Sequence, residues 1–314
     1  MDIIQLKTLI HVAELGSLSR ASDRLHITQP ALSRQIRMLE QELGVILFER
    51  SGRGMVLTGA GRDVLDHATR VMAELEAIRN AAAGDRQSFR GTVAIGTTPT
   101  VAEVVTIPLA RQLRERHPQL RLRFSAAYSG HLTDWLQRGE LDLIVTYDPE
   151  PLRSLNIVPV MMENLLLVGA GRDRLSLERP VALADLAGEA LVLPSPRHSL
   201  RSIVDSCARQ AGIELTVTVE ADAFASMIAL VRDGFGSTIL PLAPIFPQVQ
   251  DGSLCAAPLV DPAPERKLVL AYPADRPVSP ATRHVGATFA ELAADLVGRG
   301  IWMGRTIGSE PNPR

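Results

Sequence analysis

Residues 17–39 read SLSRASDRLHITQPALSRQIRML, and this stretch decides how the chain is interpreted. It predicts two short amphipathic helices joined by a tight turn, because apolar residues recur at helical spacing in two runs: Leu18, Ala21 and Leu25, then Leu32, Ile36 and Leu39. Thr28 stands where a hydroxyl can cap the second helix, and Pro30 falls in its first turn, where a missing N–H costs nothing. The exposed start of the second helix carries Gln29, Pro30, Ser33, Arg34 and Arg37. With no acid between Thr28 and Leu39, this set is typical of a helix that reads base edges and phosphates in the major groove.

A hairpin is expected directly after these helices. Apolar-rich segments at 45–48 and 55–57 flank the turn 50–54, which carries Arg50 and Arg53. Such a hairpin forms the wing of a winged helix-turn-helix and brings both arginines within reach of the DNA backbone or the minor groove. The alternative is a solvated turn on an ordinary helical domain. The wing and the acid-free helix together favour DNA binding.

Residues 59–87 contain no proline and predict a long helix. Small and apolar residues alternate at spacings of three and four, as in a coiled coil: Gly61, Val64, Ala68, Val71, Leu75, Ile78 and Ala82. A helix packed on its own domain is the alternative, but the many charges between these positions favour pairing with a second copy. Residues 1–59 hold seven Lys and Arg against six Asp and Glu, so one domain alone should bind DNA modestly. Binding as an oligomer is therefore expected.

From about residue 90 short β-rich runs alternate with helical stretches, which predicts mainly parallel sheets covered by helices. One unit covers about 92–146 and a second about 162–265. A strand at 267–272 and a helix at 280–297 then return toward the first unit. The end of the chain is polar with two prolines and is expected to be disordered.

The N-terminal region resembles LysR-type transcriptional regulators. The matching motifs are the opening helix at 6–15, the block GSLSRASDRLHITQPALSRQIRMLEQELG at 16–44, LFER at 47–50 and VLTGAG at 56–61. In that family the second helix lies in the major groove and the wing touches the minor groove. The resemblance assigns these roles to Gln29, Pro30, Ser33, Arg34 and Arg53.

The resemblance also implies a multidomain fold: a mainly α winged helix-turn-helix at 1–58, a linker helix at 59–89 that dimerises antiparallel, and a two-lobed α/β effector domain at 90–302. This last domain would be like type 2 periplasmic binding proteins, with lobe 1 at about 90–161 and 267–302, lobe 2 at about 162–266, and a disordered tail at 303–314. The implied partners are double-stranded promoter DNA, a small-molecule effector, further copies of the chain in a homotetramer, and RNA polymerase.

Ligands of open α/β sheets bind at the carboxyl ends of strands, often against helix N-termini. Hydroxyl-bearing turns at such places nominate Thr98, Thr100, Ser129, Thr146, Ser195, Ser199 and Arg201 as effector contacts, and family position supports Thr98, Thr100, Ser129 and Ser199. Each Ser or Thr could instead be an ordinary helix cap. Neutral donors and helix dipoles suit a small organic acid or oxyanion. Val101, Ile107 and Phe224 would add apolar bulk for an aromatic or aliphatic acid.

Other classes of protein find less support. Cys207 and Cys255 have neither disulfide nor metal-ligand spacing, so no metal or other cofactor is expected. Ser195, His198 and Asp205 could be read as a catalytic triad, but no G-x-S-x-G motif accompanies them, so no catalytic residue is assigned. A solute-binding or enzymatic α/β domain with an accessory helix-turn-helix remains the alternative. With no apolar span and no secretory signal in the sequence, a cytoplasmic regulator is expected.

Overall fold

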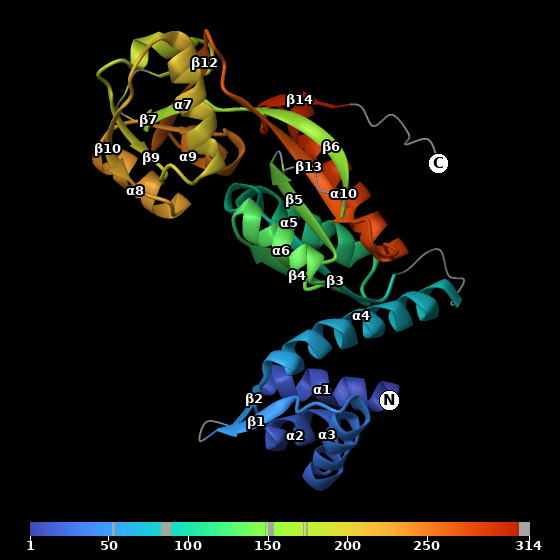
Figure 1. The fold of residues 1–314 in the computed structure, drawn as a ribbon. Helices are drawn as coiled ribbons and strands as arrows, with labels where there is room; N and C mark the ends of the chain where they lie inside the picture. Colours follow the sequence, from blue (N-terminus) through green and yellow to red (C-terminus); the bar gives the residue numbers. More distant parts are fainter. Residues whose placement is uncertain are drawn as a thin grey trace. The chain divides into compact units, whose positions relative to one another are not determined.

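The computed structural model describes residues 1–51, 54–82, 89–147, 149, 154–171, 173 and 175–307, without the side chains of 50, 51, 73, 76, 77 and 79–82. Figure 1 shows the ribbon. The chain divides into two compact units, Met1–Gly91 with Gln137–Glu140, and Thr92–Leu136 with Leu141–Arg314. No helix within the described ranges is long and apolar enough to span a bilayer.

The first unit begins with three helices, α1 (Ile3–Leu15), α2 (Leu18–Leu25) and α3 (Gln29–Leu43). The apolar stripes of α2 and α3 face inward, and Leu9, Leu32 and Leu39 are completely buried in the shared core. The turn between α2 and α3 is closed by the Ser22 hydroxyl, which donates to the Ile27 carbonyl at 2.6 Å. The predicted helix-turn-helix is therefore present.

The wing is an antiparallel hairpin of β1 (Phe48–Ser51) and β2 (Gly54–Leu57). Its first strand begins at Phe48 rather than at residue 45, because the backbone N–H groups of Leu47 and Phe48 bind the Glu40 carboxylate at 2.9 and 3.3 Å. The second strand is fixed to the turn after α1: the Met55 N–H donates to the Gly16 carbonyl at 2.9 Å. A Cβ at Gly54 would lie 2.3 Å from that carbonyl oxygen, so the close approach requires glycine.

The predicted long helix is α4 (Gly59–Ala82). Thr58 caps it by accepting the Gly61 N–H at 2.9 Å, and a Cβ at Gly61 would lie 2.1 Å from the Leu47 carbonyl oxygen. Ala68 is buried in the core of the winged domain, whereas Val71 and Ile78 are exposed. The first half of the helix thus packs on its own domain, as the alternative interpretation had it. Among the described side chains of the distal half, Val71 and Ile78 form an uncovered apolar face.

The second unit contains two lobes (Figure 1). Lobe 1 has a six-stranded sheet in the order β14-β6-β13-β5-β3-β4. Its strands and helices are β3 (Gly91–Thr97), β4 (Leu120–Ala126), β5 (Leu143–Tyr147), β6 (Leu155–Asn164), β13 (Glu265–Pro273), β14 (Gly304–Thr306), α5 (Pro99–Arg116), α6 (Ser129–Gln137) and α10 (Pro280–Gly298).

Lobe 2 has a four-stranded sheet in the order β11-β7-β12-β8 and a pair of parallel strands, β9 and β10. Its elements are β7 (Leu166–Ala170), β8 (Val181–Ala182), β9 (Ala190–Leu193), β10 (Thr216–Glu220), β11 (Thr238–Leu240), β12 (Leu254–Val260), two 3-10 helices (Leu183–Leu186 and Ala243–Ile245), α7 (Ser199–Ala211), α8 (Phe224–Asp233) and α9 (Phe246–Gln250).

The expectation of mainly parallel sheets is wrong. Parallel pairing holds for β3 with β5, but β13 runs antiparallel to both β5 and β6. The reason is that β6 leaves lobe 1 and β13 returns to it, so the two crossover strands run in opposite directions side by side. The return of the chain to lobe 1 is as expected.

The tail is a second correction. Residues 304–306 form β14, which pairs antiparallel with β6, rather than a disordered segment. The preceding Trp302 is 1% exposed, and Arg305 makes an ion pair with Glu265 at 2.9 Å. Burial of the indole and this ion pair hold the segment on the sheet edge. Residues 308–314 lie outside the described part of the chain.

Candidate functional site

The start of α3 presents the predicted DNA-contacting side chains. Gln29, Pro30, Arg34 and Arg37 are exposed and Ser33 is partly buried, opposite the buried Leu32, Ile36 and Leu39. In the described part of the chain Arg34 has no hydrogen-bond or ion-pair partner, so its guanidinium is available to DNA. Arg37 Nε donates to the Ser33 carbonyl at 3.3 Å. Thr28 is the N-cap residue, but its hydroxyl makes no capping bond, contrary to the prediction. Arg53 lies outside the described residues, as does the side chain of Arg50.

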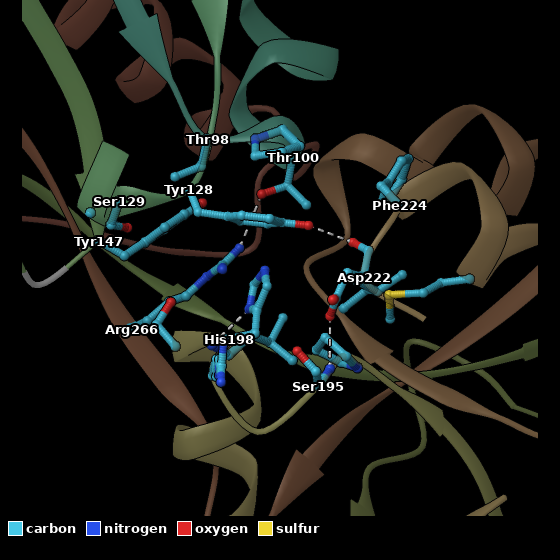
Figure 2. A pocket seen from close by; sticks show the side chains of 18 of the residues that line it. Thr98, Thr100, Tyr128, Ser129, Tyr147, Ser195, His198, Asp222, Phe224 and Arg266 are labelled. Atoms are coloured by element: carbon cyan, nitrogen blue, oxygen red, sulfur yellow. Dashed lines mark hydrogen bonds between the residues drawn. The ribbon is translucent and has the colours of Figure 1, made fainter. Parts of the chain in front are cut away.

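A pocket of about 430 Å³ lies between the two lobes of the second unit. Five of the predicted effector residues line it: Thr98, Thr100, Ser129, Ser195 and Ser199. They stand at or just before the N-termini of α5, α6 and α7, and Figure 2 shows four of them around the cavity. The Thr98 hydroxyl is buried and has no hydrogen-bond partner among the described residues. The pocket therefore contains an unused donor.

Two predicted residues do not line the pocket. Thr146 is completely buried within β5, where alternation turns it to the face opposite that of Tyr147, the neighbour that does line the cavity. Arg201 is turned away, because its guanidinium binds Asp205 at 2.8 Å and the Pro194 carbonyl at 3.1 Å. The predicted apolar bulk is also reduced, since Phe224 lines the pocket but Val101 and Ile107 do not.

The buried cation of the pocket is Arg266, which the sequence analysis missed; Arg197 also lines the pocket, but it is exposed. Arg266 is 2% exposed, and its Nε donates to Glu163, its cross-strand partner, at 2.5 Å. Its Cζ lies 3.5 Å from the centre of the Tyr147 ring, and Nη2 lies 3.4 Å from the Thr100 hydroxyl. Burial raises the pKa of Tyr147, which keeps the phenol neutral. Strand alternation could have indicated Arg266, because Leu268 and Leu270 on the same face are buried.

His198 lies on the other side of the cavity from the end of β3 (Figure 2). Its Nδ1 accepts the Leu200 N–H at 3.2 Å, so the neutral ring carries its proton on Nε2. Burial lowers the pKa of His198, and the nearby Arg266 lowers it further. The Tyr128 ring packs edge-on against His198 with 5.0 Å between ring centres. His198 is therefore a neutral hydrogen-bond donor at physiological pH.

Asp222 is the one carboxylate in the described lining of the pocket. Its Oδ1 accepts the Ser195 N–H at 2.8 Å, and this hydrogen bond holds the pKa of the carboxyl below its usual range. The Tyr128 hydroxyl donates to the Asp222 carbonyl at 3.0 Å. Most of the remaining polar groups around the cavity are donors or hydroxyls. Such a wall suits a ligand that accepts hydrogen bonds.

Comparison with known proteins assigns both units to one family. Residues 3–62 match the model of the bacterial regulatory helix-turn-helix protein of the lysR family, and residues 86–294 match the LysR substrate binding domain. The DNA-binding transcriptional dual regulator OxyR of Escherichia coli K12 is 31% identical over 280 residues, which are 89% of this chain and 91% of that protein.

Two further relatives agree. The hydrogen peroxide-inducible genes activator of Dickeya chrysanthemi is 32% identical over 89% of this chain and 91% of its own length. A full-length OxyR variant from Pseudomonas aeruginosa superposes with a TM-score of 0.70 at 25% identity, covering 93% of this chain and 97% of that one. The chain belongs to the LysR family of DNA-binding transcriptional regulators, with a C-terminal effector-binding domain.

Proposed function

We propose that this regulator binds promoter DNA as an oligomer and that a small organic acid or oxyanion in the pocket controls this binding. The observation that carries the proposal is the donor-rich wall, in which Arg266, His198 Nε2–H and the hydroxyls of Thr98 and Thr100 surround one cavity. The single carboxylate there, Asp222, already accepts a backbone N–H. Because the chromosome is the target, we place the protein in the cytoplasm.

The uncovered apolar face of α4 supports self-association. Val71 and Ile78 are exposed and lie seven residues apart, with the partly buried Leu75 between them, which is the spacing of a coiled-coil seam. Two copies joined along this face would present two recognition helices to two half-sites of an operator. Pairing of two such dimers into a tetramer follows from the family resemblance.

We propose non-covalent ligand binding rather than thiol oxidation, although all three of the similar proteins described above are named for OxyR or for hydrogen peroxide. A reactive cysteine must be a thiolate. Burial raises the pKa of both Cys207 and Cys255, and Cys255 Sγ–H donates to the Ala170 carbonyl at 3.0 Å. Both thiols are therefore protonated and poorly reactive.

Catalysis also lacks support. Asp205 is paired with Arg201, and His198 uses Nδ1 to accept the Leu200 N–H. In a Ser-His-Asp triad this nitrogen would instead donate to the acid. Ser195, His198 and Asp205 therefore do not form a catalytic triad. We assign the pocket to ligand binding alone.

The test is footprinting on DNA upstream of the protein's own gene with a panel of carboxylates, phosphate and sulfate. Thr100→Val should abolish the ligand-induced change and leave ligand-free DNA binding intact, because it removes a hydroxyl from the pocket at nearly constant shape. The matched control is Thr106→Val on the same helix, whose hydroxyl donates to the Ala102 carbonyl at 2.7 Å and does not line the pocket. A full response in Thr100→Val, or a response to cations alone, would refute the proposal.

A further inference from the structure

Glu163 joins the wall of the pocket to the C-terminal end of the chain. It is 1% exposed on β6, and its two carboxylate oxygens have different partners. Oε2 accepts from Arg266 Nε at 2.5 Å, and Oε1 accepts from Trp302 Nε1 at 2.5 Å. Trp302 directly precedes Met303 and β14, which pairs with β6 beside Glu163. One buried carboxylate is thus shared by a pocket residue and a residue of the C-terminal segment.

The ion pair between Glu163 and Arg266 determines how strongly an anionic ligand can bind the guanidinium. Glu163 already neutralises the Arg266 charge, so a ligand carboxylate must compete with Glu163 for the guanidinium. A buried carboxylate that loses its cation is strongly destabilised unless other donors hold it. The Trp302 N–H is such a donor, and it is already in place.

Arg305 ties the same segment to the adjacent residue of β13. Its Nη1 lies 3.0 and 2.9 Å from the two carboxylate oxygens of Glu265, the residue before Arg266. Residues 302–305 therefore contact both crossover strands at the point where Arg266 reaches the cavity. Glu163 therefore contacts both Arg266 and this segment.

We propose that Glu163 is a positioning residue that sets the anion affinity of Arg266, and that Trp302 and β14 respond to occupancy of the pocket. When an anion takes hydrogen bonds from Arg266, Glu163 gives up part of that ion pair and depends more on the Trp302 N–H. The environment of the Trp302 indole then changes. The pairing of β14 with β6 changes with it. This inference rests on the proposed anion site.

The first experiment uses Trp302 as its own probe. The chain has two tryptophans, so Trp135→Phe leaves Trp302 as the single tryptophan, which can be excited selectively over the tyrosines. Sodium benzoate and sodium sulfate are titrated at constant ionic strength against sodium chloride, and bound benzoate is measured in parallel by equilibrium dialysis. A saturable change in Trp302 emission that follows benzoate or sulfate is expected. Arg266→Gln should remove both the binding and the emission change.

Two variants separate positioning from mere structural support. Glu163→Gln keeps the shape and an acceptor for Trp302 but frees the Arg266 charge, so benzoate should bind about tenfold more tightly. Trp302→Phe keeps most of the packing but removes the N–H, so Glu163 holds Arg266 more firmly and benzoate should bind about fivefold more weakly. A merely structural role would not move affinity in opposite directions. If Glu163→Gln does not fold, Trp302→Phe decides alone.

The possible failures are distinguishable. Two results would overturn the coupling without affecting the proposed effector site. One is benzoate binding with unchanged Trp302 emission, and the other is an unchanged benzoate affinity in Trp302→Phe. Absence of benzoate and sulfate binding to the wild-type chain overturns the coupling and the anionic ligand class together. A footprint that still responds to some neutral metabolite would then preserve the regulator function.

Discussion

Replacing Ile78 by aspartate is expected to dissociate the oligomer without unfolding the protomer. Ile78 is 62% exposed on the distal half of α4, so a charge there meets water in a single chain. In a dimer the same side chain would lie in the seam between two helices. A carboxylate buried there without a partner is unfavourable.

The size of the effect follows from the exposed fraction. Complete burial of an isoleucine is worth about 1.5–3 kcal/mol, and 62% of that is about 1–2 kcal/mol for each helix. Each dimer contains two copies, so about 2–4 kcal/mol is lost before the cost of desolvating the carboxylate is counted. The dissociation constant of the dimer should therefore rise at least about 30-fold.

Sedimentation velocity over a concentration series measures this change, and thermal melting checks that the protomer remains folded. The matched control is Thr69→Asp, an exposed position on the same helix away from the seam, where the hydroxyl only donates to the Leu65 carbonyl at 2.9 Å. Native mass for Ile78→Asp, or equal dissociation of the control, would refute the assignment of the seam.

Three further outcomes are expected. Arg34→Ala should weaken operator binding by about 1–3 kcal/mol, measured by gel shift, if the guanidinium contacts a base. The melting curve should not change, because Arg34 is exposed. An unaltered affinity for the operator would exclude Arg34 from the DNA interface. A Cys207→Ser, Cys255→Ser double variant should keep the carboxylate response, and hydrogen peroxide should leave the wild-type footprint unchanged; loss of either result would point to thiol sensing. His117 and His284 lie with their Nε2 atoms 2.9 Å apart, and burial lowers the pKa of both below the ordinary 6.5. The unfolded chain then binds more protons than the folded one, so thermal stability should fall as the pH drops below about 6.5, and His284→Gln should reduce that dependence.

Local signals explain what could be predicted from the sequence. The helices α2 and α3 carry their apolar stripes within a few turns, and the hairpin follows directly, so adjacent residues were sufficient. The hydroxyls of Thr98, Ser129 and Ser199 could be placed because each stands between a strand and a helix. Thr98 and Ser129 meet because the ends of β3 and β4 lie at one edge of the lobe 1 sheet, whereas Ser199 comes from lobe 2 and joins them only across the cavity between the lobes.

Arg266 shows how far local signals reach. Alternation with Leu268 and Leu270 could place it on the buried face of its strand, but its partner Glu163 is 103 positions away and cannot be identified locally. Only the antiparallel register of β6 and β13 makes the two a buried pair. β14 is similar, because Gly304 to Thr306 have little apolar character and gain their order from β6 and from the burial of Trp302.

The attachment of the wing to the helices has a consequence for the DNA that this protein selects. The base of the hairpin is bound at Gly16 through Met55 and at Glu40 through Leu47 and Phe48, so it cannot swing independently of α3. If α3 lies in the major groove and the wing in the minor groove, as the family resemblance implies, a duplex must bring these two grooves to one fixed separation. DNA sequences with a narrow minor groove or a stiff base step at the wrong position resist the required change of shape, whereas more flexible sequences adopt it readily. A domain that binds both grooves in this way would discriminate among half-sites by their flexibility at base pairs that no side chain touches.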